Sequence, residues 1–162
     1  MVKQRHQARM MAVQFLFQRD FNQDDFESAL EIFWQNQEPP KRAKEFAETL
    51  IRGVLEHREE IDEMLQEYAS NWEIGRMGAI DRNVMRMAIY EMRYCMDVPP
   101  VVSINEAVDI AKEFSSLQSG HFVNGILDRA KRDLKRPLRT AQPVNWGEWK
   151  DGDEDEFSRR DG

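Results

Sequence analysis

Apolar residues recur three and four positions apart along most of the chain, which is the spacing of one face of an α-helix. No segment alternates between apolar and polar residues over the length of a half-buried strand. The pattern therefore predicts an all-α protein with seven short helices. They are expected at residues 4–21, from 24 or 25 to the break at Pro39-Pro40, from Pro40 past Val54, over 61–68 with an end near Asn71-Trp72, at 80–94, from Ser103 onward, and from just after Ser119 to before Pro137.

Prolines and one capping sequence set the expected helix ends. The residue before a proline avoids the helical region, so Val98-Pro99-Pro100 is expected to close the fifth helix. Ser103-Ile-Asn-Glu106 has the form of a capping box, in which the serine hydroxyl accepts from the amide three residues on and the glutamate reaches back. Ser103 is therefore predicted to be the N-cap of the sixth helix.

The length of 162 residues suits one domain with its own hydrophobic core, expected here at residues 1–137. Beyond Pro143 the chain is polar and contains an acidic run at 151–156. Residues 138–162 are therefore predicted to be a disordered acidic tail, with Trp146 and Trp149 as its only candidate anchors.

The formal net charge is −7, yet positive charge is concentrated in two segments. Residues 1–20 carry four Lys or Arg against one acid, and residues 128–139 carry six against two, whereas residues 147–162 carry seven acids against three bases. Phosphates respond to the local potential within about 8–10 Å, so an acidic protein of this kind can still bind RNA. The second basic segment has another explanation, because cations also stabilise a helix C-terminus.

Three features favour a cytoplasmic protein that does not enter a membrane. No run approaches the roughly 20 apolar residues of a spanning helix, and the polar N-terminus shows no secretory signal. The single cysteine, Cys95, lies within an apolar pattern and is predicted to be a buried, inert thiol.

The sequence shows no recognisable catalytic or metal-binding motif. The three histidines are scattered and the cysteine stands alone, so no metal site is predicted. There is no glycine-rich phosphate loop, nucleophile elbow or zinc-protease motif. We therefore expect neither a cofactor nor an enzymatic activity.

The N-terminal helix is the best candidate for a binding site. Arg5 and Arg9 are four residues apart and project from one face. His6 lies beside them, and Lys3 is near the same face at the helix end. A guanidinium group can bind phosphate bidentately and stack on bases, contacts that recognition of unpaired RNA often uses. The alternative is a polar helix face that only contacts water.

Three segments resemble the NusB family of bacterial transcription antitermination factors. The first is the arginine-containing opening helix at 5–17, and the second runs from Asn71-Trp72 through Asp81-Arg82 into Tyr90-Glu91. The third is the most specific. It combines Ile104-Asn-Glu-Ala and a following Ala-Lys pair with Phe122-Val-Asn-Gly-Ile-Leu-Asp128. The resemblance spans residues 3–135 and leaves out 138–162.

The resemblance implies two perpendicular helical subdomains, the first three helices packing against the rest. It also implies binding of boxA, a short single-stranded element of nascent RNA, together with the small-subunit ribosomal protein NusE. That pair would join other Nus factors on RNA polymerase and suppress termination, notably in ribosomal RNA operons. The function would be stoichiometric assembly without catalysis.

The resemblance assigns residues to two surfaces. The RNA-binding candidates are Arg5, His6, Arg9 and Gln14 on the first helix, with Lys3 added from its position, and Gln118, Ser119, His121 and Phe122 at the start of the last helix beside it. The candidates for binding the ribosomal protein are Phe17, Asp81 and Arg86. Two assignments have alternatives, since Phe122 could pack in the core and Asp81 could be a helix N-cap.

The chain departs from the family at His6 and Gln7, where arginines are common. RNA affinity is therefore expected to be weak without the ribosomal partner. Two other functions are compatible with the sequence, a protein adaptor that binds no RNA and an accessory domain of an RNA methyltransferase, although no cofactor-binding module follows here. A homodimer that buries the arginine face is also compatible with it.

Overall fold

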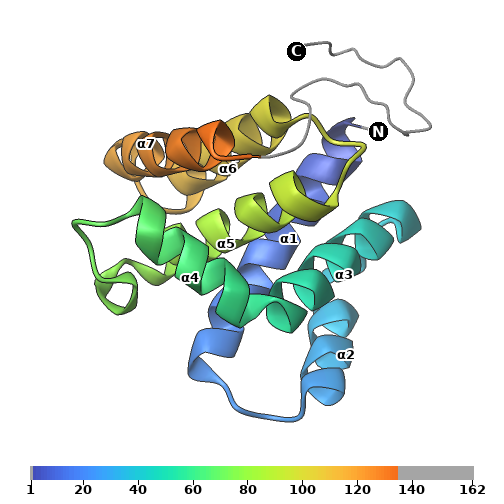
Figure 1. Cartoon of the computed structure of the whole chain (residues 1–162). Coiled ribbons are helices and arrows are strands. Elements are labelled where there is room, and N and C mark those ends of the chain that lie inside the picture. Colours follow the sequence, from blue (N-terminus) through green and yellow to red (C-terminus); the bar gives the residue numbers. More distant parts are fainter. Residues whose placement is uncertain (1, 135–162) are drawn as a thin grey trace.

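The computed structural model describes residues 2–134, which form seven α-helices and one short 3₁₀ helix without any strand (Figure 1). This confirms the all-α prediction. The helices are α1 (Val2–Phe21), α2 (Phe26–Gln37), α3 (Lys41–Glu56), α4 (Arg58–Tyr68), η1 (Ile74–Arg76), α5 (Ala79–Tyr94), α6 (Pro100–Phe114) and α7 (Leu117–Arg132).

Some predictions concern residues outside the described part of the chain. These are the domain end at 137, the basic positions 135, 136 and 139, and the acidic tail at 138–162. Within residues 2–134, no helix combines the length and apolar character that a membrane crossing needs.

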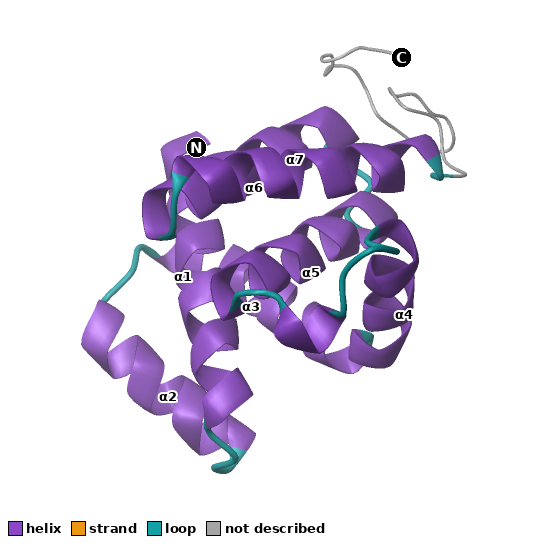
Figure 2. Cartoon of the chain, turned by 90° about the vertical axis from the view of Figure 1, so that its left-hand side faces the viewer, coloured by secondary structure: helices purple, strands orange, loops and turns teal. Residues whose placement is uncertain are grey.

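The helices fall into two groups that meet along α1 and α5. In the first group α1 packs along α3, and α2 adds aromatic rings, with Phe33 edge-on to Phe15 of α1 at 5.4 Å between centroids. In the second group α4, α6 and α7 pack on α5, and α6 lies beside α7 (Figures 1 and 2). The first three helices thus pack against the remainder, as the resemblance implies.

One apolar core runs through both groups, because each helix turns its apolar stripe inward. Its largest fully buried side chains are Phe15, Leu16, Leu50, Ile51, Ile61, Leu65, Met85, Met87, Ile89, Met92, Ile110 and Leu127. At one point α3 and α5 approach so closely that a Cβ atom at Gly53 would overlap the ring of Tyr90. Glycine at this position therefore permits the close packing of the two helices.

The last two helices begin earlier than the sequence pattern predicts. α6 begins at Pro100, a residue suited to the first helical turn, so the predicted capping box at Ser103 is wrong. Ser103 instead lies inside the helix and donates its hydroxyl to Glu91 of α5 at 2.8 Å. α7 begins at Leu117, where the Ser116 side chain accepts from the amide of Ser119.

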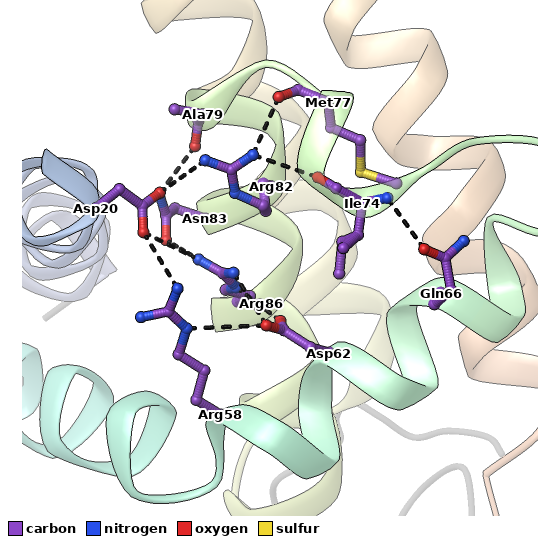
Figure 3. Close-up of polar contacts among 10 residues, drawn as sticks. All are labelled: Asp20, Arg58, Asp62, Gln66, Ile74, Met77, Ala79, Arg82, Asn83 and Arg86. Carbon is purple, nitrogen blue, oxygen red and sulfur yellow. Dashed lines mark hydrogen bonds and ion pairs between the residues drawn. The ribbon is translucent and has the colours of Figure 1, made fainter.

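A buried polar network joins the C-terminal end of α1 to α4 and α5 (Figure 3). The carboxylate of Asp20 accepts from Arg82 at 2.9 Å, Asn83 at 2.8 Å and Arg86 at 3.3 Å. Arg86 also binds Asp62 of α4 through two contacts of 2.8 and 3.0 Å. Since the side chains of Asp20 and Arg86 are almost fully buried, each charge depends on its partners in this network for compensation.

The charged partners also set the acidity of Asp20. Burial alone would raise the pKa of this carboxyl, but hydrogen bonds from Arg82 and Asn83 and the charge of Arg86 hold it below the ordinary value of 3.8. The network therefore stabilises the fold fully above the ordinary carboxyl pKa. Its contribution is lost as the pH falls through the lower pKa of the folded state.

We predict that Asp20→Asn lowers the free energy of unfolding by about 3 kcal/mol at neutral pH, because Arg86 keeps its buried charge without full compensation. The variant should also lose less stability than the parent when the pH falls below 4, because the titrating group is gone. Urea unfolding at neutral and acidic pH measures both effects. Glu73→Gln is the control, since Glu73 and its partner Arg76 are exposed, and equal losses in the two variants would contradict the assignment.

Candidate nucleic-acid interface

The N-terminal end of α1 presents accessible positive charge. Lys3 is exposed, and the side chain of Arg5 is 42% exposed. The Arg5 guanidinium lies 4.3 Å from the centre of the Phe46 ring and 3.2 Å from the carboxylate of Asp97. Asp97 is itself exposed, so this ion pair is open to water and an arriving phosphate can compete for Arg5.

The other candidates on α1 differ in how accessible they are. His6 is partly exposed and pairs through Nδ1 with Glu106 of α6 at 2.8 Å. Gln14 is exposed two turns further along the same helix. Both side chains are therefore accessible at the surface of α1.

Arg9 is not an exposed cation, which corrects the expectation that it shares an open face with Arg5. Its side chain is 3% exposed and makes two short contacts with Glu91 of α5, at 2.7 and 2.9 Å. A third contact joins it to Glu106 at 3.3 Å. Arg9 therefore ties α1 to α5 and α6, and its guanidinium is already occupied.

The surroundings of Arg9 favour its charged form. Burial alone would lower the pKa of this guanidinium, but hydrogen bonds and charge from Glu91 and then Glu106 raise it above the ordinary value. Glu91 also accepts the Ser103 hydroxyl, so both charges of the buried pair have hydrogen-bond partners. Such satisfied pairs resist rearrangement, because breaking one leaves an uncompensated charge.

The start of α7 supplies the second set of RNA-binding candidates. Gln118 and His121 are exposed, whereas Ser119 is nearly buried. The Ser119 hydroxyl donates to Asp81 of α5 at 3.2 Å, so this serine positions the start of the helix instead of facing a ligand. Ser119 thus contacts α5 at Asp81, whereas Arg9 of α1 contacts the same helix at Glu91, ten residues further on. At a rise of about 1.5 Å per residue, the Ser119 contact on α5 is about 15 Å along that helix from the Arg9 contact.

Phe122 is partly buried and also accessible from outside. It packs against the core and also lines an open pocket of about 540 Å³ with Trp72, Met77 and Asp81. The ring of Trp72 meets Phe122 edge-on at 5.5 Å and is 57% exposed, which is unusual for a tryptophan. Trp72 is therefore a binding candidate that the sequence analysis did not name. Two signals could have identified it, its position just after the predicted end of the fourth helix and its place in the second matched segment.

Two of the three partner-binding candidates are accessible. Phe17 is partly exposed and packs edge-on against the exposed Phe21 at 5.2 Å. Asp81 is partly exposed and lies within the first turn of α5, whose N-cap is Gly78, so the N-cap alternative is wrong. Arg86 is buried in the Asp20 network, which removes it from any surface and corrects its assignment to partner binding.

Asp81 has an uncommon environment for a carboxylate. Burial raises its pKa above the ordinary value, and the hydrogen bond from Ser119 offsets this only in part. Its second oxygen, Oδ1, is buried and has no hydrogen-bond partner among the described residues. A buried acceptor left without a donor carries a desolvation cost.

Within the described residues, the potential metal ligands are dispersed and the cysteine is mostly buried. No group of three potential metal ligands occurs within residues 2–134. Cys95 is mostly buried, and burial together with Glu91 and Asp97 raises the pKa of its thiol to about 12. Its thiolate is therefore scarce at neutral pH, as predicted for an inert thiol.

The family model that matches the chain is that of the NusB family, over residues 6–132. The chain belongs to the NusB family. It is 46% identical over 124 residues to the transcription antitermination protein NusB of Desulfatibacillum aliphaticivorans, covering 76% of this chain and 87% of that protein. It is 42% identical over 143 residues to the NusB of Anaeromyxobacter dehalogenans, covering 88% of this chain and 99% of that protein.

Solved structures of NusB proteins have the same fold. The NusB of T. maritima is 40% identical with a TM-score of 0.73, covering 80% of this chain and 91% of its own. A second match, 26% identical with a TM-score of 0.74, comes from a crystal structure of antitermination factors NusB and NusE in complex with dsRNA. It covers 82% of this chain and 98% of its own. The all-α NusB-like fold is thereby confirmed.

We predict that Arg9→Gln lowers the free energy of unfolding by about 3–5 kcal/mol, because it leaves Glu91 charged and buried. Arg5→Gln should change it by less than about 1 kcal/mol, because the Arg5–Asp97 pair is exposed. Denaturant unfolding followed by circular dichroism measures both. The double variant Arg9→Met, Glu91→Met should recover much of the loss, and additive losses instead would show that the pair is not coupled.

Proposed function

We propose that this NusB-family chain is a transcription antitermination factor that binds the boxA element of nascent RNA. The observation that carries the proposal is the accessible positive end of α1, with Lys3 and Arg5, on a chain whose family includes transcription antitermination proteins. A NusB solved with NusE and RNA supports it further. The activity is the assembly of a complex, and no bond is made or broken.

The cations of α1 and the aromatic side chains near α7 have different roles in this proposal. Lys3 and Arg5 bind phosphates, and His6 adds a donor once it leaves Glu106. Phe122, with Trp72 beside it, offers a face on which an unpaired base stacks, an interaction of about 1–3 kcal/mol per base. Gln14, Gln118 and His121 supply polar contacts along the way. One strand would have to extend from the start of α1 to the start of α7, which meets α5 at Asp81.

Arg9 and Ser119 act through other residues in this proposal. Arg9 fixes α1 on α5 and α6, and Ser119 fixes the start of α7 on α5. Neither side chain needs to touch RNA to affect binding. A loss of RNA affinity on changing either one therefore has to be separated from a loss of folded protein.

The proposal concerns unpaired RNA, whereas the RNA in the NusB–NusE crystal structure is double-stranded. Stacking on Phe122 requires a base that has left its neighbours, which a duplex resists. A boxA duplex is therefore a useful competitor. Single-stranded boxA should bind more tightly than the same sequence annealed to its complement.

The protein partner in the proposal is the small-subunit ribosomal protein NusE. Its docking surface would include Phe17 and Asp81, the two partly exposed candidates. The complex with boxA RNA would then join other Nus factors on RNA polymerase and suppress termination, notably in ribosomal RNA operons. This requires a protein that acts in the cytoplasm on nascent transcripts.

We predict that Arg5→Gln weakens binding to boxA RNA about tenfold at low salt, because a charge-assisted hydrogen bond to phosphate contributes about 1.5 kcal/mol. Asp97→Asn should act in the opposite direction and tighten binding by up to about fivefold, because it frees Arg5 from an exposed ion pair. Fluorescence anisotropy with labelled boxA RNA and a scrambled RNA measures both changes.

These two variants form a matched test, since each removes one charge from the same ion pair. Binding that is unchanged in both would take Arg5 out of the RNA site. Wild-type protein that ignores boxA at modest ionic strength, with and without the ribosomal protein, would overturn the proposed function. A protein adaptor would show this result while still binding NusE.

We predict that NusE tightens boxA binding by about tenfold, a coupling free energy of about 1.4 kcal/mol. The reason is that few cations of α1 are accessible to phosphates, so the affinity of the chain alone for RNA is expected to be low. Titrations of RNA with the chain alone and with a saturating amount of NusE measure this factor. Linkage requires that RNA tightens NusE binding by the same factor, and equal RNA affinities in the two titrations would contradict joint assembly.

A further inference from the structure

The first turns of α3 carry a second group of accessible cations. Lys41, Arg42 and Lys44 are exposed, with Glu45 as the one acid between positions 41 and 45. No acidic residue lies in the first turn of the helix, and no side chain caps it. Among residues 2–134, Lys41 has no ion pair. The N-terminal end of α3 is therefore a positive surface that the α1 and α7 candidates do not include.

A shallow groove of about 340 Å³ connects this surface to the cations of α1. It is lined by Gln4 and Arg5 from α1 and by Arg42, Glu45, Phe46 and Thr49 from α3. Arg5 lies over the Phe46 ring, so the guanidinium proposed to bind RNA is also one wall of the groove. A strand held by Arg5 can thus continue into the groove without leaving the protein surface.

We propose that the N-terminal turns of α3, with Lys41 and Arg42, bind the phosphates of RNA that extends beyond the segment held by α1 and α7. This inference rests on the proposed function and deepens it. The charge complementarity favours RNA, because a polyanion gains from each added cation, and Arg5 and Arg42 line one groove with the exposed Lys41 next to Arg42 in the sequence. Glu45 in the wall limits the groove to phosphates at its basic edge.

The surface also explains how a chain with few accessible cations on α1 gains affinity. Arg9 is used inside the protein, which leaves Lys3 and Arg5 as the permanent charges at the start of α1. Contacts from a second helix add to these without a longer basic run in the sequence. The binding surface is then built from two helices that lie side by side.

The test is RNA binding by the full chain carrying Lys41→Gln and Arg42→Gln. The probes are a short boxA RNA and the same RNA extended by uridines at its 5′ or 3′ end. For one of the extended RNAs, the slope of log affinity on log salt should become less steep by about 1.4, since each phosphate contact to single-stranded RNA contributes about 0.7. The short RNA should bind as it does to the parent chain. Circular dichroism establishes that the variant is folded.

Arg52→Gln is the matched control, because it removes one charge from the same helix about 15 Å from Arg42 and its exposed pair with Glu27 lies outside the groove. It should leave every slope unchanged. Unchanged slopes in the Lys41, Arg42 variant, or equal losses in the control, would overturn the inference while wild-type binding to boxA still upholds the proposed function. Loss of NusE binding with intact RNA binding would also overturn it, in favour of a protein contact.

Discussion

The buried ion pair between Arg9 and Glu91 is the interaction on which the arrangement of this protein depends. It joins α1 to α5 in the interior, and through Ser103 and Glu106 it reaches α6 as well. Replacing one partner would leave a charge in a medium that solvates it poorly. The pair therefore fixes how the two groups of helices meet, and with it the direction in which the start of α1 points.

The net charge of the chain says little about its binding surface, because burial and pairing decide which charges a ligand meets. Arg9, Arg82 and Arg86 are committed to carboxylates inside the fold. Lys3 and Arg5 remain within reach of solvent at the other end of the same helix as Asp20. An acidic protein can in this way keep a small positive surface for a polyanion, while its acids are used internally or lie elsewhere.

Local patterns predicted the helices well and the roles of single side chains less well. The apolar stripes located all seven helices, because periodicity reports which face is buried. The same spacing put Arg5 and Arg9 on one face, but only the position of Glu91, 82 residues away, decides that Arg9 is buried. Ser103 and Glu106 matched a capping sequence locally, yet both side chains bind partners on other helices, and Pro100 was the true sign of the helix start. The short η1 turn and the exposure of Trp72 had no periodic pattern to reveal them.

The 20-residue helix α1 is anchored at two points, by Arg9 two turns from its start and by Asp20 at its end. A helix held at two points has little freedom to tilt or rotate against the helices on which it packs. The geometry of the cations ahead of Arg9 is thus set when the chain folds, so docking a transcript requires little additional ordering of this backbone. Preorganisation of that kind favours affinity from few contacts, because less entropy is lost on association.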